Sequence, residues 1–544
     1  MTLRSCGWMW LGLAMACSEP SHPALPIGPS TNEPVHDDKV GTAIDHDGFF
    51  FVNQYGNDDA GNSEVDSGMP EVDSGMPEPD AGTPPVDAGT PDSGAPDAGT
   101  PDAGRPDAGQ PPVDAGMPPI DAGTPPVGNG YVIYSGDRTL SPIDATIAQH
   151  LRDIAARGNG RAGVFSKVGD SISTNGSGVN GGDFLNCFDG PLEDPSPYIV
   201  TVRMGTYGAL VPTIQYFQQT MMGSDDSWTR VSLSTQISRT ANWALTSSTP
   251  PPIDMELNAA NPRYAVVMYG SNDIGYIGPY SLADAVELYE RNMRTLTDRI
   301  IARGVIPLLT TMPPDQEFFR FVPLYAGVVR GIAQGRQIPL IDYYKELVVL
   351  PPPHGLRSDG VHPNVQNFNT PCWFDDASLI YGYNIRNLIT LQSLDRMRKV
   401  FDGASPPEPN ALRLAGDGSP GQPFIINSLP FGELRDLRAS PWRPTGQLSC
   451  SGAGNVAGPQ YTYRFTLTRT TSLRIIAVDG GARAQRVSLL SNPSLTSCMQ
   501  SDQRLITTTL QAGTYYVVLN AGSSSGGAEY NLSVTECVPG DPDC

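Results

Sequence analysis

The sequence predicts a three-layer α/β/α domain followed by a small all-β sandwich, with a disordered linker ahead of both. Three observations support this prediction. Apolar strands alternate with amphipathic helices between residues 131 and 403, which is typical of a parallel sheet covered on both faces. From residue 410 to residue 544, apolar side chains recur at every second position instead. Residues 58–126 repeat PDAG, VDAGTP and DSGMP units and hold almost nothing apolar to bury.

The α/β part begins with Ser141-Pro142, which predicts the start of a helix. A long helix is predicted after Ser281, because Asp284 stands three residues later in the capping pattern, and Gly304 ends it. A last helix near Ala377–Met397 closes the domain. The buried parallel strands are predicted at four short apolar segments, Val164–Val168, Tyr264–Tyr269, Val305–Leu309 and Ile338–Ile341.

The C-terminal part shows strict alternation in Tyr461–Leu467, where aromatic and leucine side chains alternate with threonine and arginine. Glycine-rich turns separate further segments of this kind, which predicts a small β-sandwich. The other predicted strands are Leu473–Val478, Leu505–Leu510, Tyr515–Leu519 and Tyr530–Val534.

The first 17 residues predict an export signal, with Arg4 ahead of the short apolar run Gly7–Ala16. Ala14–Cys17 allows two outcomes. Cleavage at an A-x-A site would release a soluble protein, whereas the resemblance to a bacterial lipobox predicts lipidation of Cys17 and a membrane anchor. We favour lipidation, because an acidic, proline-rich tether follows. Either outcome places the protein outside the cytoplasm, as a cell-envelope lipoprotein or a secreted protein. Residues 18–57 have no assignment.

The net charge is −22, and residues 58–125 supply −14 of it through fifteen acidic residues and one arginine. This balance argues against a nucleic-acid partner, because nothing in the chain could neutralise phosphates. Six cysteines remain beyond the signal and Cys17, and an even number in an exported protein suggests disulfides. Their positions favour Cys187–Cys372, Cys450–Cys498 and Cys537–Cys544, with free buried thiols as the alternative. The cysteine and histidine spacing gives no indication of a metal site.

Three motifs carry the chemistry: GDS at Gly169–Ser171, GSND at Gly270–Asp273 and SDGVHPN at Ser358–Asn364. The first two directly follow apolar strands, so their side chains should face one crevice at the carboxyl end of the sheet. Ser171 is the candidate nucleophile, and a serine hydroxyl needs a base to take its proton. Each motif by itself also fits a turn or a helix cap, and only the combination points to catalysis.

The base can be found by elimination among six histidines. Three lie before the linker, His150 lies in a predicted helix, and His354 follows three prolines in a loop. His362 follows Asp359 by three residues, and a carboxylate at that spacing can orient an imidazole and stabilise its charged form. Asn272 would donate an amide N–H to an oxyanion, together with the backbone N–H of Ser171.

In this order, the three motifs resemble the SGNH hydrolase superfamily, also called GDSL esterases and lipases, over about residues 131–400. The resemblance implies a flavodoxin-like sheet and a triad of Ser171, His362 and Asp359, with Asn272 in the oxyanion hole. It implies no cofactor.

The family's second motif carries a glycine whose N–H is a further oxyanion donor, and here the sequence departs from the pattern. The matching stretch is Leu233–Leu245, after a predicted strand, and it has no glycine. Ser238 or Arg239 would take that place, and we prefer Ser238 because it is smaller. Gly205 and Gly208 are a weaker alternative.

The C-terminal sandwich resembles the pre-peptidase C-terminal domains of exported bacterial enzymes, through its strand pattern and the string AGTYYVVL at Ala512–Leu519. The resemblance implies an accessory role in attachment or substrate contact. The whole chain is therefore expected to be an exported serine esterase that hydrolyses carboxylic esters, including acetyl esters of carbohydrates. Two alternatives stay open: an O-acyltransferase that uses the same site, and a catalytically silent surface-binding protein.

Overall fold

The computed structural model describes residues 131–174, 184–193, 199–367, 369–444, 446–450, 456–523 and 526–544. The expected signal, Cys17, residues 18–57 and the linker at 58–126 lie outside these residues. Within them, no helix is long and apolar enough to span a bilayer.

A parallel sheet forms from the four apolar segments that predicted it, in the order β1-β2-β3-β4. Continuous apolar runs suit these strands because helices cover both faces of the sheet. The strands are β1 (Arg161–Gly169), β2 (Pro262–Met268), β3 (Ile306–Thr310) and β4 (Leu340–Ile341).

The strand expected before Leu233–Leu245 does not form among the described residues; instead, Thr235, inside this stretch, makes one parallel bridge with Gly169 of β1. Nearby side chains take the backbone donors that a longer strand would use: the Leu233 N–H donates to Glu256 and the Ser234 N–H to Ser232. The bridged residue lies on one side of β1, and β2, β3 and β4 follow on the other side. This is the strand order of flavodoxin-like sheets.

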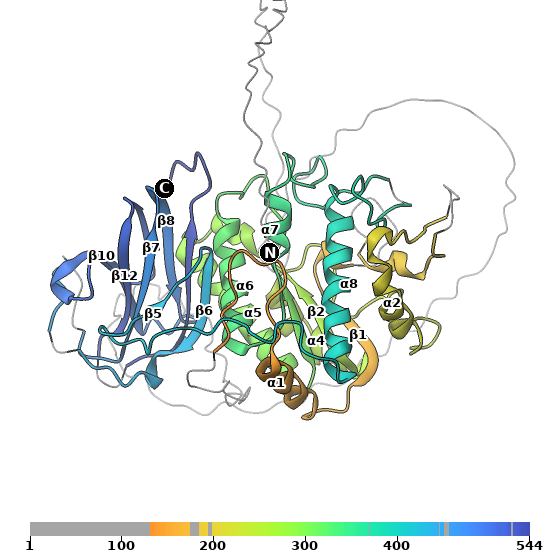
Figure 1. Ribbon diagram of the computed structural model, residues 1–544, viewed down its shortest axis with the longest axis horizontal. Helices are drawn as coiled ribbons and strands as arrows, with labels where there is room; N and C mark the ends of the chain where they lie inside the picture. Colours follow the sequence, from red (N-terminus) through yellow and green to blue (C-terminus); the bar gives the residue numbers. More distant parts are fainter. Residues whose placement is uncertain are drawn as a thin grey trace, which may run out of the picture. The chain divides into compact units, whose positions relative to one another are not determined.

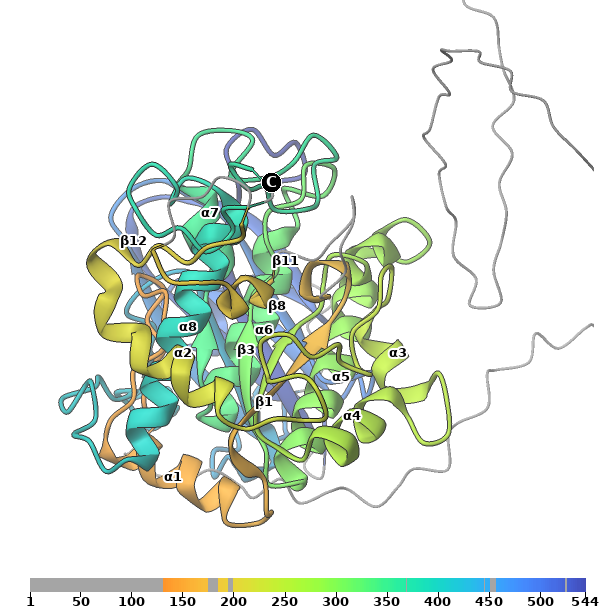
Figure 2. The same cartoon turned by 90° about the vertical axis from the view of Figure 1, so that its right-hand side faces the viewer.

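Helices form a layer on each side of this sheet (Figures 1 and 2). One layer holds α1 (Ala145–Ala155), α2 (Val211–Gln218) and α8 (Gly382–Phe401). The other holds α3 (Ala241–Thr246), α4 (Pro252–Ala260), α5 (Leu282–Ala302) and α6 (Val322–Arg336). The short helix α7 (Tyr343–Val348) follows β4. The expected three-layer α/β/α arrangement is confirmed.

Two predicted helix starts are wrong. Asp144 caps α1 by accepting from the Ile147 N–H, whereas the Ser141 hydroxyl accepts from the Leu340 N–H of β4 and so ties its loop to the sheet. Helix α8 starts at Gly382 and not near residue 377, because the preceding residue is extended and the Asn364 side chain accepts the first N–H. The cap of α5 is as predicted, since Ser281 Oγ accepts from the N–H three residues later.

The C-terminal residues form two sheets, with strand orders β10-β9-β12-β7-β5 and β11-β8-β13-β6. The five predicted strands are present. Strands β5, β6, β9 and β10 are not predicted, because they are very short or mix polar residues into the apolar alternation. The strands are β5 (Phe424–Ile425), β6 (Phe431–Asp436), β7 (Gln460–Leu467), β8 (Thr471–Val478), β9 (Gln485–Leu490), β10 (Cys498–Asp502), β11 (Leu505–Leu510), β12 (Gly513–Ala521) and β13 (Glu529–Glu536).

Helix α6 lies directly on the sandwich strands β6 and β13 (Figure 1). Gly327, Gly331 and Gly335 recur every four residues on the helix face that meets these strands, and a Cβ atom at any of them would overlap sandwich atoms. Asn531 of β13 also donates to the Val328 carbonyl at 3.0 Å. The helix is therefore buried between the parallel sheet and the sandwich.

All three expected disulfides are present: Cys187–Cys372, Cys450–Cys498 and Cys537–Cys544. The first joins two segments of the α/β part, and the other two lie in the sandwich. Asn387 of α8 lies between the two segments that the first disulfide joins, because its side chain bonds the Leu185 N–H at 3.0 Å and the Pro371 carbonyl at 2.9 Å.

Candidate active site

Ser171 lies at the carboxyl end of β1, as the first residue of a short 3-10 turn, η1 (Ser171–Ser173). Asp170 caps this turn by accepting from the Ile172 N–H at 3.1 Å. Gly169 has no space for a side chain, since Met268 and Ser173 occupy the place of its Cβ. Close packing of β1 and β2 at this point therefore sets where the serine leaves the strand.

His362 lies between the serine and a carboxylate. Its Nε2 is 2.9 Å from Ser171 Oγ, and its Nδ1 is 2.9 Å from Asp359 Oδ2. The Asp359 side chain is 45% exposed and that of His362 18%, so the carboxylate faces solvent and the imidazole is partly covered. Residues that stand 191 positions apart in the chain are thus joined in one hydrogen-bonded row.

The carboxylate at Asp359 is held in its ionised form. Partial burial opposes ionisation, but hydrogen bonds from the His362 ring and from the backbone N–H groups of Val361 and His362 outweigh it and lower the pKa of Asp359 to about 2. An ionised carboxylate on Nδ1 favours the tautomer that leaves Nε2 without a proton and therefore able to accept one.

Asn272 follows β2 and reaches toward the serine turn. Its Nδ2 donates to the Arg239 carbonyl at 3.2 Å and to Asp170 Oδ2 at 3.4 Å. Both bonds are long, so an oxyanion could replace one of them at small cost. Ser238 precedes Arg239 and has φ +58, a left-handed backbone that glycine adopts most easily.

Two buried carboxyl groups support these loops. Burial raises the pKa of Asp170 to about 6, although the Ile172 N–H, nearby Arg386 and His362, and the Asn272 amide each oppose the rise. Burial, together with the charge of Asp170, raises the pKa of Asp273 to about 8 even though Ala241 N–H donates to it. Both groups hold backbone amides, which is how such residues shape loops.

Sequence reasoning missed the residues that support the turn at Ser171–Ser173. Arg386 of α8 is fully buried, donates to the Ile172 carbonyl and to Ser173 Oγ, and stacks over the Phe184 ring at 3.7 Å. Tyr383, one turn earlier, donates to the same carbonyl at 3.3 Å. An arginine among apolar residues in the last predicted helix was the available signal, because such a residue needs buried acceptors.

The remaining candidates lie outside this row. His354 stacks on Phe319 with ring centroids 5.2 Å apart, and His150 bonds to the Arg336 carbonyl. Gly205, with Gly208 in the same 3-10 segment, packs against the Phe374 carbonyl.

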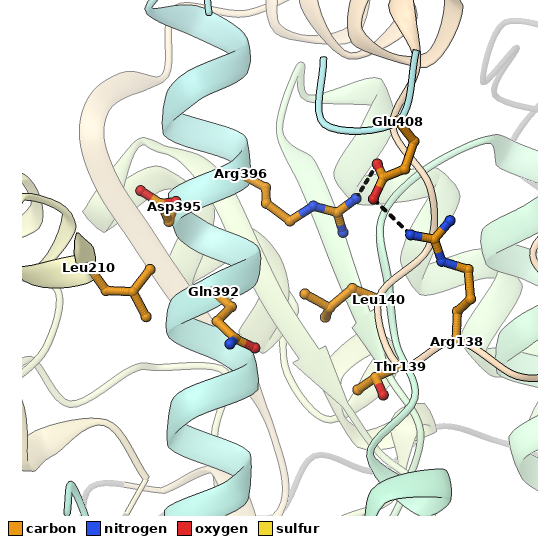
Figure 3. A pocket seen from close by; sticks show the side chains of 8 residues that line it. All are labelled: Arg138, Thr139, Leu140, Leu210, Gln392, Asp395, Arg396 and Glu408. Carbon is orange, nitrogen blue, oxygen red and sulfur yellow. Dashed lines mark hydrogen bonds and ion pairs between the residues drawn. The ribbon is translucent and has the colours of Figure 1, made fainter. Parts of the chain in front are cut away.

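A cavity of about 440 Å³ lies beside α8 (Figure 3), and neither Ser171 nor His362 lines it. Glu408 pairs there with Arg138 and Arg396, so these charges are already partnered. Among the described residues, one group has the spacing of metal ligands, Cys537, Asp541 and Cys544. Its two sulfurs are bonded to each other, which leaves only a carboxylate to bind a cation.

The fold and the motifs at the strand ends together define an α/β ester hydrolase. Residues 168–366 match the family described as "GDSL-like Lipase/Acylhydrolase family". This part of the chain is therefore a GDSL-type domain, as the motifs predicted, and the protein is a carboxylic ester hydrolase.

The chain is also similar to several solved structures. A catalytic mutant of an acetylxylan esterase from Geobacillus stearothermophilus is 17% identical with a TM-score of 0.28, over 43% of this chain and 95% of that chain. A GDSL-like lipase from Bacteroides thetaiotaomicron is 14% identical with a TM-score of 0.26, over 46% of this chain and 98% of the other.

The pre-peptidase C-terminal domain of a collagenase from Bacillus anthracis is 15% identical with a TM-score of 0.15, over 20% of this chain and 92% of that chain. No curated protein matches the chain. At such low identities and TM-scores, these likenesses do not bear on the reaction or the substrate of this protein.

Proposed function

We propose that the protein is an exported serine esterase in which Ser171 is the nucleophile, His362 the general base and Asp359 the residue that orients the base. The observation that supports this most directly is the row of two 2.9 Å contacts from Asp359 through His362 to Ser171 Oγ. Contacts of this length are within the reach that proton transfer needs.

In the first step, Ser171 Oγ attacks the ester carbonyl carbon while His362 Nε2 takes the hydroxyl proton. The tetrahedral intermediate then collapses, and the same proton passes from His362 to the leaving alcohol. Water, activated by His362, attacks the acyl-serine and releases the acid. Asp359 stabilises the positive charge of the ring in both halves without accepting the proton.

We assign the oxyanion donors to the Asn272 Nδ2 and to the backbone N–H groups of Ser171 and Ser238. When the oxyanion forms, the amide of Asn272 would exchange its long bond to Asp170 for a charge-assisted one. The left-handed backbone at Ser238 supports this residue over Arg239 as the counterpart of the family's second-motif glycine.

Export is proposed from the predicted signal, with lipidation of Cys17 as the favoured outcome, and three disulfides fit an oxidising compartment. The proposed substrates are carboxylic esters, including acetyl esters of carbohydrates.

A fluorophosphonate probe and a short-acyl nitrophenyl ester test the proposal. Wild-type protein should be labelled, and Ser171→Ala should be neither labelled nor active. His362→Ala should lose nearly all turnover while remaining folded, and Asp359→Asn should lose less, because the base stays in place. Full activity in His362→Ala would rule out the assigned base. A folded wild-type protein that resists the probe would point to the silent binding protein, and faster discharge of the acyl-enzyme by alcohols than by water would point to an acyltransferase.

A further inference from the structure

The loop between β3 and α6, residues 311–321, contacts residues 354–362, which end at His362. We call residues 311–321 the bridging loop and residues 354–362 the His362 segment. The backbone N–H of Gln316 donates to the Gly360 carbonyl at 2.9 Å. Gly360 has φ +73, and a Cβ there would lie 2.8 Å from the Gln316 side-chain oxygen. Gly360 stands between Asp359 and His362 in the chain, so the bridging loop packs directly against the His362 segment.

A second contact joins the same two segments. The ring of Phe319, in the bridging loop, stacks on His354 with an interplanar angle of 16°. His354 is itself fixed, because its Nδ1 bonds the Leu350 carbonyl at 2.7 Å. Further along, the Arg357 N–H donates to the His362 carbonyl at 2.7 Å. The bridging loop therefore contacts the His362 segment at two places and helps to fix its position.

On its other side, the bridging loop is held by the β-sandwich. Arg474 of β8 donates to the Arg320 carbonyl at 2.8 Å and forms an ion pair with Asp541 at 2.7 Å, with side chains only 3% and 1% exposed. A surface pair between Arg320 and Asp543 lies beside it at 2.7 Å. The buried pair is the stronger constraint, because exposed pairs contribute little and a buried one leaves an uncompensated charge if it breaks.

Both acidic residues belong to one small ring of the chain. Asp541 and Asp543 lie in residues 537–544, which the Cys537–Cys544 disulfide closes directly after β13. We call residues 537–544 the C-terminal ring. The disulfide restricts how far Asp541 can move from β13 and so keeps the carboxylate beside Arg474.

We propose that the C-terminal ring is a positioning element of the active site: through Arg474 and the bridging loop it holds the His362 segment against Ser171. The inference rests on the proposed function, because it takes His362 as the base. The ring residues, Arg474 and Gln316 act through other residues, so they are positioning residues. The effect can be large, since a displacement of about 1 Å caused far from the chemistry can cost about 100-fold in rate.

The test compares two disulfides of the same sandwich in the full chain. In Cys537→Ser/Cys544→Ser we expect kcat for a short-acyl nitrophenyl ester to fall about tenfold, within the range that small misplacements produce. KM should stay nearly unchanged, and labelling by a fluorophosphonate should slow by the same factor as kcat. The matched control is Cys450→Ser/Cys498→Ser, which opens a disulfide at the edge strand β10, and it should keep wild-type kcat even where its melting temperature is lower.

The proposal is wrong if the C-terminal pair variant keeps wild-type kcat, or if both pair variants lose kcat in proportion to their loss of melting temperature. Arg474→Lys decides the matter should the pair variant fail to fold. It keeps a positive charge beside Asp541 but loses the planar guanidinium whose N–H donates to the Arg320 carbonyl, so kcat should fall while the protein stays folded. Unchanged kcat in Arg474→Lys would also overturn the proposal.

Ser171→Ala distinguishes a failure of the proposed function from a failure of the positioning role. If this variant keeps its activity, the proposed function fails. If it is inactive while Cys537→Ser/Cys544→Ser turns over like wild type, the proposed function stands and only the positioning role is lost.

Discussion

Ser238, which we propose takes the place of the family's second-motif glycine, has a left-handed backbone although it is not glycine. Its φ of +58 lies in the left-handed region, where a side chain costs about 1 kcal/mol relative to glycine. A glycine could adopt the same backbone conformation, and the N–H that we propose as an oxyanion donor is present in either residue. Ser238 has a positive φ and Arg239 does not. The residue types alone do not indicate this difference.

We therefore expect Ser238→Gly to be more stable than wild type by up to about 1 kcal/mol, because the strain is relieved. Turnover should stay within a few-fold, since the N–H remains. Urea unfolding and ester hydrolysis measure the two quantities. Ser238→Ala is the control: it keeps both the strain and the N–H. A large loss of kcat in Ser238→Ala would show that the hydroxyl, and not the backbone, acts.

Asp273 leads to a prediction about pH. Its pKa in the folded protein is raised to about 8 by burial and by Asp170, from an ordinary value of 3.8. The folded state therefore holds a proton that the unfolded state has already released between about pH 4 and pH 8, so this group makes the protein less stable as pH rises through that window.

Asp273→Asn should remove this contribution, because the amide is neutral at every pH and can still accept from the Ala241 N–H. The difference in unfolding free energy, variant minus wild type, should rise from pH 5 to pH 8, as measured by urea unfolding at each pH. A difference that stays constant across this range would show that Asp273 is ionised throughout.

At the scale of elements, the sequence of α6 is constrained by close neighbours. It is buried along nearly its whole length, and its three glycines let its backbone approach β6 and β13. Glycine inside a helix costs about 1 kcal/mol relative to alanine. Close packing against the sandwich offsets that cost, which is why helix propensity alone does not account for these positions.

Gly331→Ala should therefore destabilise the protein, in spite of the better helix propensity of alanine. The new methyl group would overlap the Asn531 side chain, and overpacking of this kind typically costs about 1–3 kcal/mol. Gly208→Ala is a matched control, because a Cβ at Gly208 meets no atom within 4 Å. Thermal unfolding of both variants measures the difference. Equal melting temperatures would mean that α6 and β13 can separate readily.

On the scale of the whole molecule, the α/β part and the sandwich share buried surface and charges. Ile476 and Val478 of β8 belong to the same core cluster as the parallel sheet. Arg336 of α6 pairs with Glu529 of β13 at 2.5 Å as well as with Asp298. Loss of the sandwich would expose the buried face of α6 and remove Glu529, one of the two acidic partners of Arg336.

A chain that ends at residue 403 should accordingly be poorly soluble and bind a hydrophobic dye, whereas the full chain should not. Yield of soluble protein and dye fluorescence are the measurements. A soluble truncated chain with wild-type melting temperature and turnover would show that the sandwich is dispensable for folding. It would also show that the sandwich is not needed to position the His362 segment.

The sequence predicted the class of fold well, because its evidence is local. Strands that are buried on both faces need continuous apolar runs, as in Tyr264–Tyr269, and helix caps need particular side chains, as at Ser281. Local patterns gave wrong helix starts where a residue from elsewhere in the chain forms the hydrogen bond instead. The Ser141 hydroxyl accepts from β4 and does not cap α1, and the Asn364 side chain accepts from the first N–H of α8. Strands without apolar alternation, such as β10, left no signal.

The sequence by itself determined which residue types are available for ester hydrolysis: Ser171 and Asn272, which follow predicted strands, and Asp359 with His362 further along the chain. Only the tertiary structure decided that Ser171 and His362 approach to 2.9 Å, that Arg386 supports the turn from behind, and that a loop held by the sandwich packs against Gly360. These contacts join residues far apart in the chain, and their distances depend on how helices and sheets pack rather than on any local pattern.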